Sequence, residues 1–189
     1  MIRPIMILAV IFFLSNDLYS QPIKKSWELS FSGNMGSVSS SYSGQSNSSQ
    51  FIALTFHPGF FVTENIEIEP EIQWLAADGD KPLLSYSANV AYNFGNPPST
   101  KIPFILLGFG RTNSIPFNRT LLFRSSDKHD ISILNVGAGM KFLAAKNVAF
   151  RMEYRHQSFT YSRSFGNTTN KYSTKYNQML FGFSIFFKT

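Results

Sequence analysis

A hydrophobic alternation with a period of two residues recurs along most of this chain and limits the folds that it can adopt. In the clearest example, residues 66–76, apolar side chains at Ile66, Ile68, Ile72 and Trp74 alternate with polar ones. Successive residues of a β-strand point to opposite faces, so this segment predicts a strand with one apolar and one polar face. The same pattern is found in eight segments, at 25–36, 49–62, 65–76, 83–94, 102–111, 130–143, 147–161 and 175–188. Helical periodicity is not evident in any segment, and we expect an all-β fold.

The connections between these segments alternate in length. Three are short, at 63–65, 95–101 and 144–146, whereas the alternate ones are mostly long and polar, at 36–48, 112–129 and 162–173, with only 77–81 brief. An even number of antiparallel strands, with tight turns at one end and long loops at the other, is the layout of a transmembrane barrel. We therefore predict an eight-stranded antiparallel up-and-down transmembrane β-barrel with its long connections outside the cell.

Charged residues of both signs lie on the polar faces of the predicted strands. They are Glu28, Glu67, Glu69, Glu71, Lys141, Arg151, Glu153 and Arg155. The interior of an eight-stranded barrel is just wide enough for side chains to fill, so we expect these groups to form a lumen charge network. With five acids and three bases in this set, we expect some carboxylates to be solvated or protonated.

The apolar faces carry large aromatic side chains, which separates the barrel from its main structural alternative. A soluble two-sheet sandwich also alternates, but it turns its apolar face inward. Aromatic residues on the apolar face instead suit the girdles at the two surfaces of a membrane. The candidates are Trp27, Trp74, Tyr86, Tyr92, Tyr154 and Phe187.

Glycine and proline have specific positions within the predicted strands. Gly108, Gly110, Gly137 and Gly139 fall on the inward face, where they leave room for long Arg and Glu side chains. Pro58 and Pro70 count against the strand assignment, because each removes a hydrogen-bond donor from the ladder.

The N-terminal residues differ from the rest of the chain. A positive charge at Arg3 is followed by a ten-residue apolar run from Ile5 to Leu14 and a polar stretch that ends at Ser20. This order is typical of a secretory signal peptide cut between Ser20 and Gln21, and ten apolar residues are too few to span a membrane. We therefore divide the chain into a signal peptide at 1–20 and a barrel domain at 21–189.

Composition excludes several classes of protein. The 189-residue chain has no cysteine, which excludes a disulfide scaffold, a thiolate metal site and a lipoprotein anchor. Its three histidines are scattered, so we expect neither a metal site nor a cofactor. A mean hydropathy of −0.06 argues against a helical membrane protein. The net charge of +6 does not indicate a nucleic-acid partner, because the chain is exported and has no basic helix.

Several motifs resemble those of one family. Residues 135–143 and 147–155 form a pattern of a Gly-x-Gly strand, a tight turn and an Arg-x-Glu-Tyr-Arg strand. Residues 104–110 (FILLGFG) fit a preceding Gly-x-Gly strand of the same pattern, and residues 92–95 (YNFG) fit the end of its fourth strand. This set resembles the bacterial outer-membrane β-barrel family of the OmpA/OmpX type, also called the porin family. Residues 182–187 (GFSIFF) are similar to the terminal strand that the barrel-assembly machinery recognises in this family. The resemblance implies a monomer in the outer membrane of a Gram-negative bacterium, but it does not specify an activity.

A His-x-Ser pair, His156 and Ser158, is the feature on which catalysis would rest. Residues two apart on a strand share a face, here the lipid-facing one, and a serine nucleophile needs an adjacent base. The pair resembles the His-x-Ser motif of the outer-membrane lipid A 3-O-deacylase family, in which a Glu orients the His. No Glu follows His156, and Asp130 is the nearby acidic residue that would replace it.

Basic residues outnumber acidic ones around the two longest loops. Arg111, Arg119, Arg124 and Lys128 lie near the first loop, and Arg163, Lys171 and Lys175 near the second. Such cations bind phosphates, so we expect outer-membrane lipid and lipopolysaccharide as partners, beside the barrel-assembly machinery. We expect a non-enzymatic outer-membrane barrel without catalytic residues, with a structural or surface-interaction role. A lipid A 3-O-deacylase-like ester hydrolase is the alternative.

Overall fold

The computed structural model describes residues 26–42, 45–77, 82–94, 99–112, 131–165 and 168–187. The signal peptide expected at 1–20, Asp130, and the loop residues Arg119, Arg124 and Lys128 lie outside the described residues. No helix among the described residues is long and apolar enough to cross a membrane.

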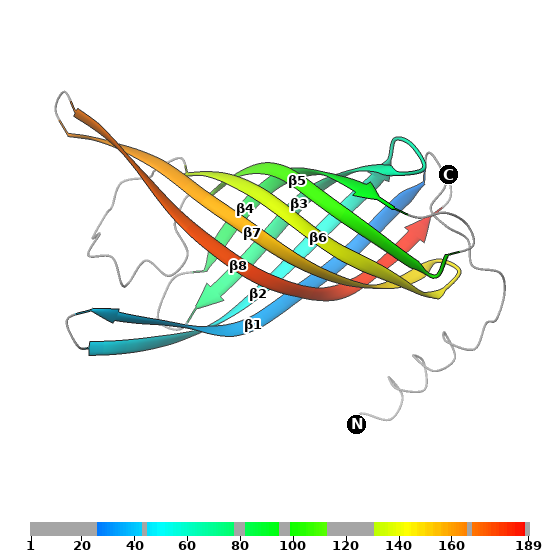
Figure 1. The fold of residues 1–189 in the computed structure, drawn as a ribbon, viewed down its shortest axis with the longest axis horizontal. Helices are drawn as coiled ribbons and strands as arrows, with labels where there is room; N and C mark the ends of the chain where they lie inside the picture. The colour runs from blue at the N-terminus through cyan, green and yellow to red at the C-terminus, as the bar shows by residue number, and fades with distance from the viewer. Residues whose placement is uncertain are drawn as a thin grey trace.

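Eight antiparallel strands form a closed barrel (Figure 1). The strands are β1 (Trp27–Tyr42), β2 (Gln45–Phe61), β3 (Ile66–Ala77), β4 (Leu83–Asn93), β5 (Lys101–Thr112), β6 (Ile131–Ala145), β7 (Val148–Phe165) and β8 (Thr168–Phe187). Each strand pairs with its neighbours in the sequence, and β1 pairs with β8 to close the barrel. The predicted fold class is confirmed.

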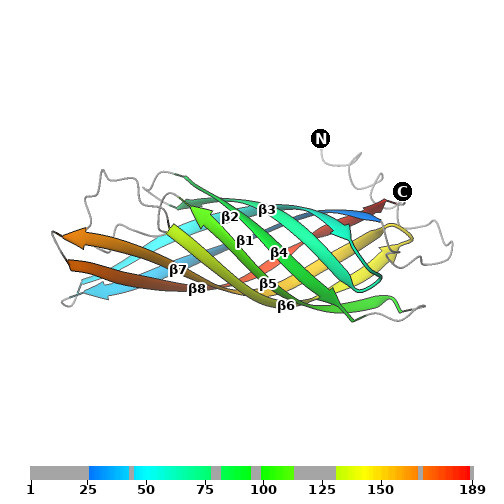
Figure 2. The ribbon, with the colours of Figure 1, turned by 90° about the horizontal axis from the view of Figure 1, so that it is seen from above.

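Two of the predicted loops are strands. Residues 36–48 and 162–173 were expected to be long loops, but β1 and β2 remain paired up to Tyr42↔Gln45, and β7 and β8 up to Phe165↔Thr168. Figures 1 and 2 show these two hairpins reaching beyond the other strands at one end of the barrel. The hydrophobic alternation is absent from these segments of the sequence, whereas the backbone pairing of the ladder continues through them.

The short connections are at the opposite end, as predicted. Between β2 and β3, the Thr63 hydroxyl accepts a hydrogen bond from the backbone N–H of Ile66 at 2.9 Å, a side-chain-stabilised turn. Between β6 and β7, the strands are joined by a turn at Lys146 and Asn147, next to a register shift between Leu143 and Ala145.

The outer surface of the barrel is an apolar belt. The six aromatic residues predicted for girdles are all exposed, from 38% for Trp74 to 55% for Tyr86. Trp27 and Tyr92 lie towards the short-turn end, whereas Trp74 and Tyr86 lie towards the long-hairpin end. Two aromatic levels with Ile, Leu, Val and Phe between them are the pattern of a barrel exterior in contact with lipid.

The two ends of the lumen are closed by apolar side chains. Phe61, Ile102, Leu143, Ala149 and Phe186 pack together at the short-turn end. At the other end Ile131, Ile133 and Phe159 form one cluster and Ala53, Leu75 and Leu83 form a second. Between these layers most inward side chains are polar or charged, and the apolar ones among them are Ala91, Phe104, Leu106 and Leu180.

Pro58 and Pro70, the two prolines weighed above, are accommodated at one interruption of the ladder. Pairing of β2 with β3 stops at Phe56↔Ile72 and resumes at Phe60↔Ile68. Pro58 and Pro70 each lie midway in this gap, so the two missing N–H donors fall at the same place and a single break absorbs both.

Candidate functional site

Lys141 on β6 lies in the lumen just above the apolar layer of the short-turn end. Its Nζ is 2.6 Å from Glu28 Oε2 on β1 and 2.8 Å from Glu67 Oε2 on β3. The ammonium also lies 5.4–5.9 Å from the ring centres of Phe61, Phe104 and Phe186. The side chain is fully buried, so it depends on these partners to offset the loss of hydration.

Arg151 and Arg155 on β7 reach across the lumen to β3. Arg151 forms a two-pronged pair with Glu69, with Nη1–Oε1 at 2.8 Å and Nη2–Oε2 at 3.0 Å. Arg155 donates to both oxygens of Glu71 through Nη1, at 2.7 and 2.6 Å. Glu153 lies between the two arginines, 2.9 Å from Arg151 Nη2 and 2.6 Å from Arg155 Nε. Since β3 and β7 are opposite strands of the barrel, these pairs tie opposite walls together.

All eight charged residues of the predicted set are brought together in the lumen. None is more than 3% exposed, and each carboxylate lies within hydrogen-bonding distance of a lysine or arginine. Of the two alternatives expected for the excess carboxylates, solvation is therefore wrong because all five are buried, whereas protonation of some of them stays a prediction.

His57 on β2 is a member of this cluster that we did not identify from the sequence. Its Nδ1 is 3.7 Å from Glu69 Oε2 and 3.6 Å from Glu71 Oε2, and its Nε2 is 3.1 Å from the Ser32 hydroxyl. The alternation of segment 49–62 places His57 on the inward face together with Thr55, and its inward position could have been predicted from that alternation. Among the described residues, no group of three or more His, Asp or Glu side chains is arranged to hold a metal ion.

A row of side-chain amides lines much of the lumen wall above the charges. Each amide nitrogen donates to the next oxygen, at 3.3, 2.9, 3.0, 3.0 and 3.0 Å in turn. In order of donation the members of this amide row are Asn34, Gln178, Gln157, Asn135, Asn89 and the Glu71 carboxylate. The row runs from β1 through β8, β7, β6 and β4 to β3, so one series of bonds connects six strands.

The row passes over β5 because Gly108 has no side chain. A Cβ at this position would overlap Asn89 Oδ1 and lie 2.7 Å from Asn89 Cγ. The inward glycine predicted here thus makes room for an amide rather than for the Arg and Glu side chains that we expected.

His156 and Ser158 lie outside the barrel on the outward face of β7. His156 Nδ1 is 2.7 Å from Asn177 Oδ1 on β8, and since an amide oxygen only accepts, the hydrogen bond forms when Nδ1 carries a proton. The Ser158 hydroxyl is 3.3 Å from the Ser173 hydroxyl. The Cα atoms of residues two apart on a strand are roughly 7 Å apart, and no His156–Ser158 hydrogen bond occurs in the described part of the chain.

The basic residues predicted to bind lipopolysaccharide are described only in part. Arg111 is exposed on the outward face near the end of β5, and Lys175 is exposed on the outward face of β8. Arg119, Arg124 and Lys128 belong to the segment outside the described residues.

A closed antiparallel barrel with a lipid-compatible belt outside and a polar interior defines a transmembrane β-barrel. The chain matches the family model of the outer membrane protein beta-barrel domain over residues 6–187. No curated protein matches it at a significant level.

Two solved structures show the same architecture. The chain is similar to the N-terminal beta-barrel domain of Pseudomonas aeruginosa OprF, with 15% identity, a TM-score of 0.51, and coverage of 87% of this chain and 98% of that chain. It is also similar to the outer membrane protein OprG from Pseudomonas aeruginosa, with 16% identity, a TM-score of 0.51, and coverage of 92% and 100%. At these identities the likeness concerns the fold alone.

The chain therefore belongs to the family of the outer membrane protein beta-barrel domain, and the predicted resemblance to outer-membrane barrels is confirmed. Membership of this family implies the outer membrane as its location.

Proposed function

We propose that the protein is a non-enzymatic outer-membrane barrel with a structural and surface-interaction role, and that its outer basic residues bind lipopolysaccharide phosphates. The observation that carries this proposal is the lumen, which is filled by bonded side chains while two hairpins extend beyond the belt. In this proposal residues 1–20 direct export, the barrel-assembly machinery inserts the chain as a monomer, and the hairpins face outward.

The lumen supports a structural role because its bonds join opposite walls. The Arg151–Glu69 and Arg155–Glu71 pairs connect β7 to β3, and apolar layers close both ends of the described barrel. An eight-stranded barrel filled in this way is a rigid support for the hairpins rather than a water-filled passage.

Charge at the outer surface supports the interaction role. Arg111 is exposed beside Tyr86 at the outer aromatic level of the belt, and Lys175 is exposed on β8. The sequence between β5 and β6 contributes Arg119, Arg124 and Lys128. Arginine and lysine donate charge-assisted hydrogen bonds to phosphate oxygens, which are the anionic groups of lipid A.

Binding of the purified protein to vesicles with and without lipopolysaccharide tests this proposal. The test variant has glutamine in place of Arg111, Arg119, Arg124 and Lys128. Its binding to vesicles with lipopolysaccharide should be at least about tenfold weaker and less dependent on salt, because the phosphate contacts are lost. A matched control replaces Lys101 and Lys146, which are exposed at the short-turn end. Equal binding by both variants and the parent, or equal binding to lipid A without phosphates, would refute the proposal.

An ester hydrolase is the second candidate function, and the His156–Asn177 contact is the observation that favours it. An amide that fixes the tautomer of a histidine is the third-partner role that a serine hydrolase needs, here filled by Asn177 instead of a carboxylate. Asp130, the acidic residue first considered for this role, lies outside the described residues.

Mass spectrometry of lipid A after incubation with the protein separates the two candidates. The non-enzymatic proposal predicts that the parent releases no acyl chain and that Ser158→Ala folds and inserts normally. Loss of one acyl chain with the parent, but not with Ser158→Ala or His156→Ala, would establish the hydrolase instead.

A further inference from the structure

The barrel wall is incomplete where its first and last strands meet. β1 and β8 pair from Trp27↔Phe187 to Gly33↔Phe181 and no further. Beyond that point β1 pairs only with β2, and β8 pairs only with β7 (Figure 1). The two facing strand edges therefore diverge while their outward residues still belong to the apolar belt.

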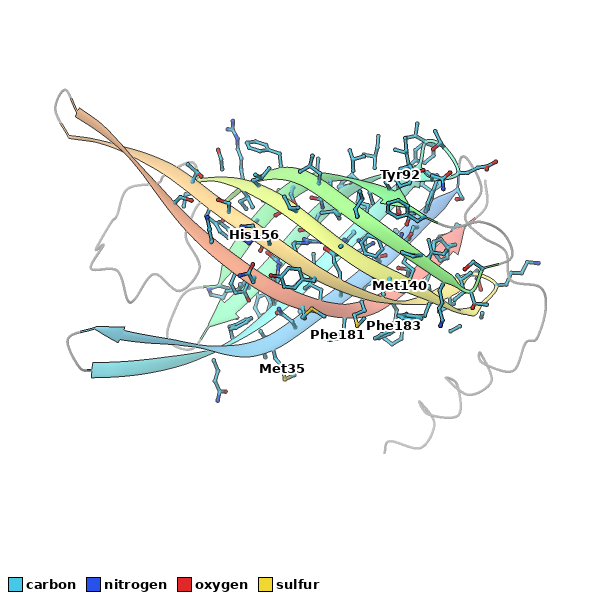
Figure 3. All side chains as sticks on the ribbon, in the orientation of Figure 1. Met35, Tyr92, Met140, His156, Phe181 and Phe183 are labelled. Carbon is cyan, nitrogen blue, oxygen red and sulfur yellow. The ribbon has the colours of Figure 1, made fainter. Side chains whose placement is uncertain are left out.

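A cavity of about 490 Å³ lies in this divergence, and we call it the β1–β8 slot. Its outward lining is apolar, with Met35 on β1, Leu54 on β2, and Met179 and Phe181 on β8. Met35 is 82% exposed, the highest value among the large hydrophobic residues of the described chain, and Figure 3 shows it projecting from the barrel. The volume is within the range of about 300–1,000 Å³ that is typical of binding sites for small molecules.

The inner wall of the slot is preformed. Asn34 and Gln178 line the slot on its lumen side, and the Asn34 amide donates to Gln178 Oε1 at 3.3 Å across the gap. This bond is the first link of the amide row, so both side chains are held by a series of bonds that continues to Glu71. An occupant entering from the membrane meets a fixed wall, which lowers the entropy cost of binding.

Gly33 at the base of the slot keeps it open. This glycine faces outward, and a Cβ here would lie 2.8 Å from the Ala53 carbonyl oxygen and 3.1 Å from Leu54 Cδ2. A side chain at this position would press on the β2 wall of the slot.

The rim of the slot nearest the hairpins is polar. Asn177 lines the slot and holds His156, and Lys175 is exposed two residues further along the same outward face of β8. An apolar cleft below an amide, an imidazole and an ammonium matches a lipid in which an acyl chain lies below an ester or amide linkage and a phosphorylated headgroup.

We propose that the β1–β8 slot binds one acyl chain of a lipid A molecule from the outer leaflet. A gap in a wall that faces hydrocarbon is filled by lipid, because water has no place there. The long-hairpin end of such barrels faces outward, where lipid A forms the leaflet. The inference rests on the orientation given under the proposed function. It does not depend on the phosphate contacts proposed for Arg111, Arg119, Arg124 and Lys128.

Native mass spectrometry of the full-length barrel, released from detergent micelles with added lipid A, tests the slot. The parent should retain one intact lipid A. Met179→Trp and, as a second variant, Met35→Trp should reduce the retained fraction at least about tenfold by filling the slot. Leu107→Trp is the control, because Leu107 is 60% exposed on β5, at the opposite wall. Circular dichroism and thermal unfolding show whether each variant has folded. If one slot variant fails to fold, the other slot variant decides the test.

Each outcome is decisive. Retention by the parent and by Leu107→Trp, with loss in a folded slot variant, supports the proposal. Equal retention of lipid A in all four proteins, or no retention in the parent, overturns the proposal. Preferential retention of phosphatidylethanolamine or of a plain alkane overturns the choice of lipid A as the occupant. The variant with glutamine at Arg111, Arg119, Arg124 and Lys128 should still retain the lipid, so failure of the loop proposal and failure of the slot are distinguishable.

Discussion

Replacing Arg151 with leucine removes the cation that is bonded to two lumen carboxylates. The guanidinium pairs with both oxygens of Glu69 and with Glu153, and its carbon lies 4.5 Å from the Phe104 ring centre. Arg151 is 1% exposed and Glu69 is 0% exposed, so water cannot replace the lost contacts. After the substitution Glu153 retains Arg155, but Glu69 loses its bidentate partner.

The expected loss of unfolding free energy depends on the charges that the substitution leaves unpaired in the lumen. The described cluster has five carboxylates against three cations, a formal charge of −2 with every carboxylate ionised and His57 neutral, and on the same count Arg151→Leu makes it −3. Removing one member of a buried pair costs about 3–5 kcal/mol, whereas replacing both members with apolar residues is often close to neutral. We therefore expect Arg151→Leu to lose about 3–5 kcal/mol of unfolding free energy, and Arg151→Leu with Glu69→Leu, which restores −2, to recover about half or more of that loss.

Urea titration of the refolded protein in lipid bilayers measures these differences through the fluorescence of Trp27 and Trp74, the two tryptophans of the chain. Lys175→Leu is the control, since Lys175 is exposed and its loss should change the unfolding free energy by less than about 0.5 kcal/mol. If the single variant were as stable as the parent, or if the double variant lost the sum of both single losses, the reasoning from a desolvated pair would be wrong.

Three further predictions concern the belt, the amide row and the orientation. Phe181→Arg should cost about 2–4 kcal/mol in the same titrations, because it places a charge on the lipid-facing surface, and a harmless effect would contradict the assigned face. Gly108→Val should cost about 1–3 kcal/mol by displacing Asn89 from the amide row, and an unchanged urea midpoint would argue against that row. A protease-sensitive tag inserted after Gly44 should be cleaved on intact cells, and one after Glu64 should be protected; cleavage at Glu64 would reverse the orientation.

The period-two alternation predicted which way the charged side chains point, and the connection lengths and outward aromatic residues together with it predicted the barrel. Once residues 66–76 are recognised as a strand, the direction of each Glu on β3 follows from the period of two, and the same holds for Arg151 and Arg155 on β7. The alternation ended at the edge of the belt, and for that reason the outer parts of β1, β2, β7 and β8 were predicted as loops. Backbone pairing requires no hydrophobic alternation, so the ladder in these segments could not be predicted from the hydrophobic pattern.

The partners of individual side chains were not predictable from the sequence. His57 and the amides of the row lie on faces that parity had already assigned inward, but which of them meet depends on the stagger between neighbouring strands. The same is true of Asn177, whose contact with His156 follows from the β7–β8 register.

The sequence by itself determined the strands within the belt, their faces and the order of turns, since these depend on local alternation and on the residues between strands. Only the tertiary structure decided that Arg151 meets Glu69 across the lumen, that Pro58 and Pro70 fall in one gap, and that β1 separates from β8 beyond Gly33. These features depend on how the sheet closes on itself. Closure of the barrel fixes which residues face one another even when they lie about half the chain apart in the sequence. A local sequence pattern contains no information about such distant pairs.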